Sequence, residues 1–227
     1  MENPWLEIID TFDKGIYILP GDQDVIDDFN KLVHDEYKIH TDVFPAPFMG
    51  DVGGSPIVLL TLNPGFDKEE FNKGYYNRYA HFWKKELQHK PSVDDLRLFC
   101  LEKEYCESSN YWEKKLNPLI AISSVEKVAN SVSVIQFFPY HSIKYKDFPV
   151  RISKKKLKSQ LYNFHLVKKA IEREAIIIIL RSRKKWMNAI PELVNYEKCY
   201  STSSYLNPIL SENNLKSCFE LLRAALR

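Results

Sequence analysis

The stretch IVLLTLNPGFD, residues 57–67, contains the first side chains that could do chemistry. An apolar run of strand length leads to Asn63, and Pro64 and Gly65 then turn the chain. A buried strand that opens into a tight turn is a common position for ligand-binding groups in α/β proteins. A carboxamide has no useful basicity, but its oxygen can hold and orient a small molecule such as water. The alternative for Asn63 is structural, an Asx hydrogen bond that starts the turn.

The two residues after this turn, Phe66 and Asp67, have both functional and structural interpretations. The carboxylate of Asp67 could act as a general base or stabilise a nearby cation. Glu70 follows three residues later, the spacing of a helix N-terminal capping box, and this spacing favours a cap over a catalytic role. Phe66 could stack on a planar ligand or simply pack in the core.

Three further candidates lie near the predicted strands. Phe48 precedes the first apolar run and is a second stacking candidate, with core packing as the alternative. Gln136 lies in the run VSVIQFF, where a buried carboxamide must find hydrogen-bond partners, whether in a ligand or in the core. His141, in PYHS, carries a ring that titrates near neutral pH, although a single loop histidine is more often a surface residue.

The elements that must position these residues alternate along the chain. Continuous apolar runs predict interior strands, and periodic apolar positions predict helices between them. The segment 41–56 holds three Pro and three Gly, so no regular structure is expected there. The expected strands are 57–62, 132–138, 175–180 and a weaker 197–202, and the expected helices are 23–36, 78–89, 92–104, 109–130, 153–173, 184–193 and one from Asn213.

Buried strands separated by helices are typical of a parallel sheet that is covered on both faces. We therefore expect a three-layer αβα sandwich with a mainly parallel central sheet of about four strands. It should form a single domain over residues 1–227, with residues 1–43 as an N-terminal helical extension packed on it. Functional groups should lie at the carboxyl ends of the strands, in the segments NPGFD, PYHSIKYKDFP and STSSYLNPILSENN.

The charged residues are unevenly distributed. The net charge is only +2, but the segment from Lys144 to Lys169 holds nine Lys or Arg residues and one Asp. Such a segment is compatible with a nucleic-acid-binding face, and equally with solvated basic helices.

The cysteines and the hydropathy pattern bound the class of protein. Cys100, Cys106, Cys199 and Cys218 form no C-x-x-C pair, so neither zinc nor an iron–sulfur cluster is expected. The longest apolar run is too short to cross a bilayer, and no signal segment opens the chain. We expect a soluble protein of a reducing compartment, the cytoplasm, with no membrane partner and no cofactor.

Taken in order, these motifs resemble the uracil-DNA glycosylase superfamily, and most closely its mismatch-specific and thymine-DNA glycosylase branch. TLNPG is similar to the first motif of that branch, and GYYNRYAHFWKKEL resembles its stretch ending in Phe-Trp and a basic helix. YLNPILSENNL resembles the second motif, so the resemblance covers roughly residues 44–227. Thr61 stands where the family usually has Gly, and Asn207-Pro208-Ile209 stands where relatives read His-Pro-Ser or Asn-Pro-Ser.

The resemblance implies a monofunctional, monomeric enzyme that hydrolyses the N-glycosidic bond of a base extruded from double- or single-stranded DNA. The reaction passes through a cation-like sugar and an anionic base, which a positioned water and hydrogen-bond donors to the base would assist. Asn63 would position the water, and Asn207 would donate a hydrogen bond to the departing nucleobase. Asp67 is the candidate for a general base that accepts a proton from the water. The other implied residues are Phe48, Phe66, Gln136, His141, Ser204 and Tyr205 for the substrate, and Lys144, Lys154, Lys155, Arg183 and Leu206 for DNA.

Several alternatives remain open at this point. The target could be uracil or a mismatched base, or a bulkier hydroxymethylated or glucosylated cytosine of phage DNA, which the altered second motif favours. A non-catalytic DNA-binding module on the same fold is an alternative of another class. A nucleotide-using small-molecule enzyme is a third, but no Gly-rich phosphate loop follows any predicted strand.

Overall fold

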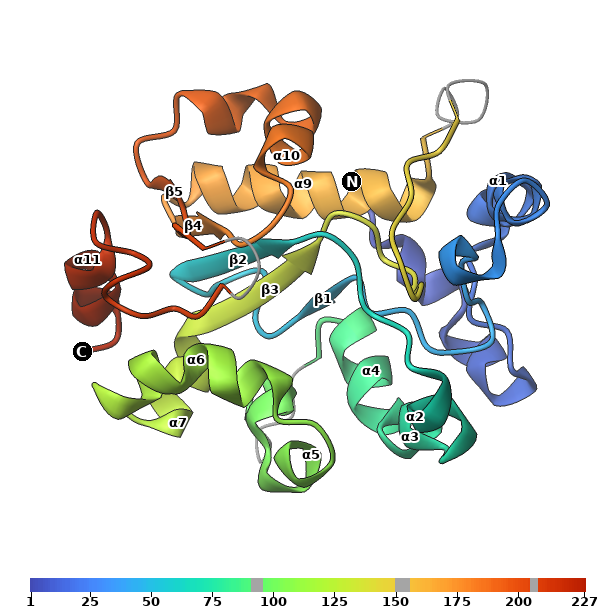
Figure 1. Cartoon of the computed structure of the whole chain (residues 1–227), viewed down its shortest axis with the longest axis horizontal. Helices are drawn as coiled ribbons and strands as arrows, with labels where there is room; N and C mark the ends of the chain where they lie inside the picture. The colour runs from blue at the N-terminus through green and yellow to red at the C-terminus, as the bar shows by residue number, and fades with distance from the viewer. Residues whose placement is uncertain (91–95, 150–155, 205–207) are drawn as a thin grey trace. The chain divides into compact units, whose positions relative to one another are not determined.

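The computed structural model describes residues 1–90, 96–149, 156–204 and 208–227 (Figure 1). The chain divides into two compact units, and each unit collects three separate segments. Residues 1–43 belong to the first unit together with segments from the middle of the chain, and the expectation of a single domain stays a prediction. Unit 1 comprises Met1–Pro47, Leu62–Lys90 and Gln136–His165, and unit 2 comprises Phe48–Thr61, Pro91–Ile135 and Leu166–Arg227.

A five-stranded sheet with the order β1-β3-β2-β4-β5 forms the centre of unit 2. β2 (Ile57–Thr61) pairs in parallel with β4 (Ile176–Ile179), which pairs in parallel with β5 (Cys199–Ser201). On the other side of β2 lies β3 (Val132–Gln136), and β1 (Phe48–Met49) pairs with β3 in antiparallel fashion. The protein is thus a mixed α/β protein with a mostly parallel sheet.

The three continuous apolar runs form the interior strands β3, β2 and β4, as predicted. Every residue of β2 and β3 is buried, as expected for strands that are covered on both faces. The sheet has five strands rather than about four, because β1 forms inside the segment 41–56 that was expected to lack regular structure. Gly50 follows β1 with φ +79°, and a Cβ there would lie 2.7 Å from the Val132 carbonyl oxygen, so this approach requires glycine.

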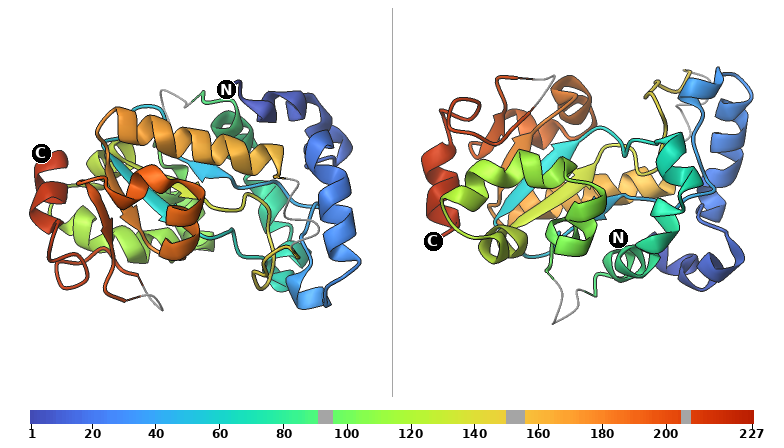
Figure 2. Two further views of the ribbon diagram at one scale, coloured as in Figure 1. Left: turned by 90° about the horizontal axis from the view of Figure 1, so that it is seen from above. Right: turned by 60° about the horizontal axis from the view of Figure 1, so that its bottom comes forward.

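Helices lie on both sides of this sheet within unit 2. Figures 1 and 2 show α6 (Tyr111–Ala121) and α7 (Val125–Ser131) on one side and α10 (Arg183–Ala189) on the other. The long helix α9 (Lys158–Glu172) begins in unit 1 and ends in unit 2. The other helical elements of unit 2 are η4 (Phe99–Leu101), α5 (Lys103–Ser108), α6 (Tyr111–Ala121), α7 (Val125–Ser131), α10 (Arg183–Ala189), η5 (Pro191–Val194) and α11 (Phe219–Ala225).

Three predicted helices are interrupted, and the one expected over 184–193 is α10 followed by η5. The helix expected over 109–130 is two helices, since Ser124 accepts a hydrogen bond from the Lys127 amide at 3.2 Å and caps a new helix after α6. In the described part of 92–104, a short 3-10 turn precedes α5. The helix predicted over 23–36 is shifted to α1 (Pro20–Asn30), with proline at its first position. The last helix, α11, starts at Phe219 rather than at Asn213.

Unit 1 is mainly helical in its described part, with an aromatic core. Tyr140 and Asp22 are fully buried, and the Tyr140 hydroxyl donates to Asp22 Oδ2 at 2.8 Å. The other carboxylate oxygen, Oδ1, accepts from the Lys158 amide at 2.7 Å, so Asp22 joins α1 to the first turn of α9. The further helical elements of this unit are η1 (Pro4–Glu7), η2 (Ile9–Lys14), η3 (Asp35–Tyr37), α2 (Lys68–Asn72), α3 (Tyr75–Arg78) and α4 (Ala80–Leu87).

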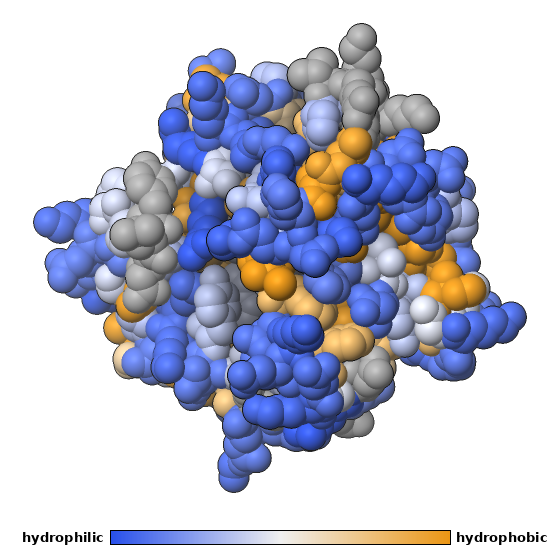
Figure 3. Space-filling view, turned by 45° about the vertical axis from the view of Figure 1, so that its right-hand side comes forward, coloured by the Kyte–Doolittle hydropathy of each residue, from blue (hydrophilic) through white to orange (hydrophobic). Residues whose placement is uncertain are grey.

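Large apolar side chains are exposed on several separate elements. In unit 1 the large exposed ones include Leu6, Leu32 and Ile143, which lie on different elements. The face drawn in Figure 3 is largely hydrophilic, with separate hydrophobic areas. Among the described residues, no helix is both long and apolar enough to span a membrane.

Candidate functional site

The segments that follow β2 and β3 lie side by side in unit 1. The Phe138 amide donates to the Leu62 carbonyl at 2.8 Å, and the Phe66 amide donates to the Ser142 carbonyl at 3.1 Å. Gly65 and Ser142 form a parallel bridge, in which the Ser142 amide also donates to the Pro64 carbonyl at 3.4 Å. The loop NPGFD is therefore held against the loop PYHS at the carboxyl ends of two neighbouring strands, where the sequence places ligand chemistry.

The side chain of Asn63 is oriented by hydrogen bonds to both loops. Its Nδ2 donates to the Pro64 carbonyl and to Ser142 Oγ, each at 2.9 Å. Because a carbonyl oxygen only accepts, the amide nitrogen must face it, and Oδ1 must face the other way. Asn63 is half-buried, and within the described residues no hydrogen bond reaches its Oδ1. An Asx bond from Oδ1 is therefore not what forms this turn.

Ser142 is a site residue that the sequence analysis did not select. It is 3% exposed, and its hydroxyl accepts from Asn63 across 79 positions of sequence. The only local signal was its place beside His141 in PYHS, at the end of a predicted strand. Ser142 fixes the direction of the Asn63 amide without lying in a recognisable motif.

His141 is buried between the two loops. Its Nδ1 lies 2.6 Å from the Gly65 carbonyl oxygen and must carry the proton, because that oxygen can only accept. Burial lowers the pKa of His141 to about 4, and the Gly65 carbonyl offsets this effect only in part. The ring is thus neutral near pH 7, and the Phe44 backbone, like the Gly65 carbonyl, offsets part of the effect of burial. The burial of His141 contradicts the alternative of a surface position, and its predicted role in substrate binding stays a prediction.

Phe66 belongs to a stack of aromatic rings. His40 lies parallel to it with ring centres 3.5 Å apart, and Tyr76 lies parallel at 5.7 Å. The Tyr76 hydroxyl accepts from the Asp67 amide at 3.0 Å, and burial raises its pKa to about 12. Phe66 is 9% exposed and forms a small core with Val43 and Tyr76. Its packing role is visible, and stacking on a base would need His40 to leave.

Asp67 is the N-cap of α2. Its Oδ1 accepts from the amides of Glu69 and Glu70, at 2.8 and 3.0 Å. This confirms the capping interpretation drawn from the spacing of Asp67 and Glu70. Burial raises the pKa of Glu70, and the nearby Asp67 charge adds to the rise. With its carboxylate engaged at the helix end, Asp67 is a weak candidate for a general base.

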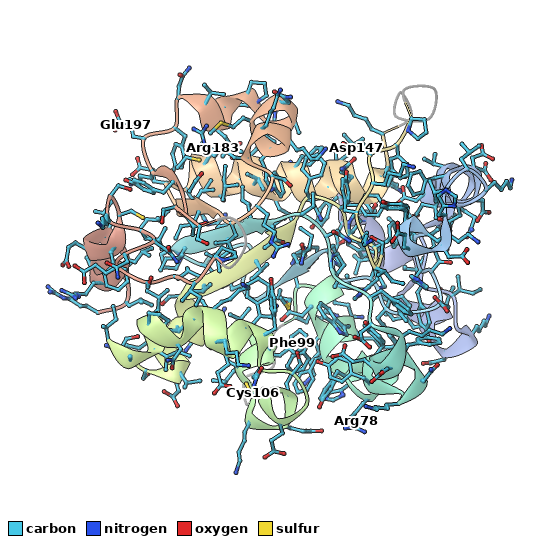
Figure 4. The ribbon with its side chains drawn as sticks, viewed as in Figure 1. Arg78, Phe99, Cys106, Asp147, Arg183 and Glu197 are labelled. Carbon is cyan, nitrogen blue, oxygen red and sulfur yellow. The ribbon has the colours of Figure 1, made fainter. Side chains whose placement is uncertain are left out.

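The remaining predicted residues are distributed over both units. Phe48 is fully buried in β1 of unit 2. Gln136 is 6% exposed at the end of β3, and its backbone carbonyl accepts a hydrogen bond from Asn163 Nδ2 at 2.8 Å. Lys144 pairs with Glu36 at 2.6 Å, and this pairing raises the pKa of Lys144. In unit 2, the Ser204 carbonyl accepts from Thr202 Oγ1, and Arg183 lies exposed at the start of α10 (Figure 4). Lys154, Lys155, Tyr205, Leu206 and Asn207 lie outside the described residues.

The described residues contain no group of three or more His, Cys, Asp or Glu side chains placed to hold a metal ion. The four cysteines are free thiols. Comparison of the chain with protein-family models, with curated proteins and with solved structures gives no match.

Proposed function

We propose that the protein is a monofunctional DNA glycosylase that hydrolyses the N-glycosidic bond of an extruded pyrimidine base. The observation that carries the proposal is the orientation of Asn63. Its amide nitrogen is held from two sides, and its Oδ1 is left to accept a hydrogen bond beyond the end of an interior strand. This arrangement suits an oxygen that positions a water molecule.

In the proposed reaction, the oxygen of the positioned water forms a bond to C1′ of the sugar as the bond from C1′ to the base nitrogen breaks. The base leaves with the electron pair of that bond, and the proton released by the water passes to solvent. Asn63 cannot take this proton, because a carboxamide is not basic. His141 is neutral near pH 7 but is buried against Gly65, and Asp67 caps a helix. Hydrolysis should therefore be slow and depend on how stable the departing base is as an anion.

The proposal extends to the fold and to the partners. In this proposal the sheet and its flanking helices form a three-layer αβα sandwich. The protein acts as a cytoplasmic monomer on double- or single-stranded DNA. Asn207 is assigned to donate a hydrogen bond to the departing base, and the basic residues Lys154, Lys155 and Arg183 to contact phosphates. Modified cytosines are the preferred targets to test beside uracil, because the second motif departs from its usual form.

A non-catalytic DNA-binding module is the second candidate. It is favoured by the engagement of Asp67 in the α2 cap, because this leaves the site without an evident general base. It is opposed by the fixed direction of the Asn63 amide, which a DNA-binding module does not need.

Release of free base separates the two candidates. Wild-type protein should release base from at least one duplex in a panel carrying uracil, mismatched thymine, hydroxymethylcytosine or its glucosylated form. Asn63→Ala should fold and bind the same duplex, with a cost of about 1 kcal/mol from the lost turn hydrogen bonds, but lose most base release. Asn63→Asp adds a carboxylate that can accept a proton, but an ionised carboxylate cannot donate to the Pro64 carbonyl. Activity should therefore survive or rise if water activation is limiting, and fall if the orientation held by that hydrogen bond is limiting. Base release by Asn63→Ala at the wild-type rate would reject the assignment of this site.

A further inference from the structure

Phe66 in unit 1 carries an aromatic ring on each of its two faces. The His40 ring lies parallel to it with ring centres 3.5 Å apart and 5° between the planes, and the Tyr76 ring lies parallel at 5.7 Å. A ring at 3.5 Å leaves no room for a second ring on the same face, so His40 and Tyr76 cover opposite faces. A planar ligand can therefore stack on Phe66 only in place of one of these two rings.

The two covering rings are held to different degrees. Tyr76 is 7% exposed, and its hydroxyl accepts from the Asp67 amide at 3.0 Å. The His40 side chain is 24% exposed, and its Nδ1 lies 3.4 Å from Oδ1 of Asp42, whose own side chain is 57% exposed. His40 is thus the ring that can be exchanged, because it already reaches solvent and its partner Asp42 is solvated.

The stack of His40 on Phe66 is not an arrangement that the two rings favour strongly. Aromatic pairs prefer offset or edge-on arrangements with centres about 4.5–7 Å apart over a close face-to-face stack. His40 Nδ1 carries the proton, since the Asp42 carboxylate can only accept, and Nε2 is left as an acceptor. This Nε2 is buried and has no hydrogen-bond partner among the described residues. Rotation of the ring into solvent would hydrate Nε2, which lowers the free-energy cost of leaving the stack.

The movement needed is confined to the His40 side chain. The Asn30 side chain holds both backbone groups of Ile39, accepting from its amide at 2.8 Å and donating to its carbonyl at 2.9 Å. The His40 amide donates to the His141 carbonyl at 2.9 Å. Because these bonds hold the backbone in place, the ring can leave Phe66 by rotation about its own side-chain bonds.

We propose that His40 occupies, in the free protein, a stacking site on Phe66 for a planar heterocyclic base, and that the base enters as the His40 ring rotates into solvent. The inference rests on the proposed function, because the ligand is the base extruded from DNA. His40 competes with that base for one face of Phe66. The apparent affinity for DNA is therefore reduced by the fraction of molecules in which His40 has left the stack.

His40→Gln and His40→Ala test this competition, with His34→Gln as the matched control. His34 is an exposed histidine of the same segment, directly before η3. All variants carry Asn63→Ala, so that the base stays attached during the measurement. Affinity is measured for duplexes carrying uracil, mismatched thymine, hydroxymethylcytosine or its glucosylated form. Burial lowers the pKa of His40, and at about pH 8 an ordinary histidine, with a pKa of about 6.5, is also uncharged, so the substitutions do not change the charge.

We expect both His40 variants to bind at least one of the four duplexes more tightly than the parent protein. The gain should be about tenfold if His40 is out of the stack in a tenth of the parent molecules. His34→Gln should bind like the parent. In a Phe66→Leu background His40→Gln should give no gain, because the surface for which ring and base compete is lost.

The proposal is overturned if neither His40 variant binds any of the four duplexes more tightly than the parent. An equal gain in His34→Gln, or an equal gain of His40→Gln in the Phe66→Leu background, also overturns it. Tighter binding without base release by the protein with native Asn63 would keep the stacking site and reject the glycosylase. Base release without tighter binding would reject only the role of His40.

Discussion

Ser142→Ala should slow base release by weakening the hold on Asn63. The substitution removes one of the two hydrogen bonds that Asn63 Nδ2 donates, and leaves the one to the Pro64 carbonyl at 2.9 Å. A neutral hydrogen bond contributes about 0.5–1.5 kcal/mol net, so the equilibrium constant for the working orientation of Asn63 should fall by roughly 2- to 13-fold. The expected result is a loss of rate of at most about 13-fold, the upper end of this range.

The assay is single-turnover base release, measured together with duplex affinity. Ser142 positions Asn63 rather than touching the substrate, so the rate of the chemical step should fall while affinity stays the same. Ser133→Ala is the control, because Ser133 is also a buried serine and its hydroxyl has no hydrogen-bond partner among the described residues. The reasoning is refuted if Ser142→Ala keeps the wild-type rate on a duplex where Asn63→Ala does not. Equal losses in Ser142→Ala and Ser133→Ala would point to a general effect of packing instead.

Three further predictions concern stability and are tested by urea denaturation. Asp67→Ala should lower the free energy of unfolding by about 0.5–2 kcal/mol, because it removes the cap of α2. Asp67→Asn should lower it less and, if Asp67 is only a cap, leave the rate of base release unchanged. Asp22→Ala should lower the free energy of unfolding by roughly 2–5 kcal/mol, since the Tyr140 hydroxyl and the Lys158 amide lose their acceptor. Asp22→Asn should lower it less. Equal losses in the two variants would argue against a stabilising role of these hydrogen bonds. For His141, the unfolded chain takes up a proton near pH 6.5 and the folded protein only near about 4, so its stability contribution is complete above pH 6.5 and is lost as the pH falls towards 4. The loss is about 3 kcal/mol at most, and His141→Gln should show a flatter pH dependence than wild type.

The sequence predicted the parts of the fold that depend on continuous local patterns. The runs 57–62, 132–138 and 175–180 indicated interior strands because parallel strands covered on both faces have no polar side to display. The cap at Asp67 could be predicted for a similar reason, since it depends on residues three positions apart. β1 was not predicted, because a strand of two residues in a Pro- and Gly-rich segment has no periodic pattern of apolar positions.

The candidate site could be predicted only on one of its two loops. Asn63 stood out because it ends an apolar run, but its partner Ser142 lies 79 residues away, and nothing in PYHS indicates that contact. His40 was missed in the same way, since its stack on Phe66 joins positions in separate segments. For His141, a surface position was the alternative to a role in the site, and its burial was missed because a loop position says nothing about the loop that covers it. Contacts between distant segments depend on the packed structure, which local spacing does not encode.

The interleaved path of the chain limits how this protein can be cut. Its six segments alternate between the two units, so the backbone passes from one unit to the other five times. No single stretch of the gene encodes either unit, and ending translation after Thr61 would leave unit 1 without Leu62–Lys90 and Gln136–His165. A ribosome must therefore release the C-terminal segment before unit 2 has all its parts, and unit 1 needs residues as late as His165. Fragment expression is consequently a poor route to either unit, and deletions should be confined to surface positions within one segment.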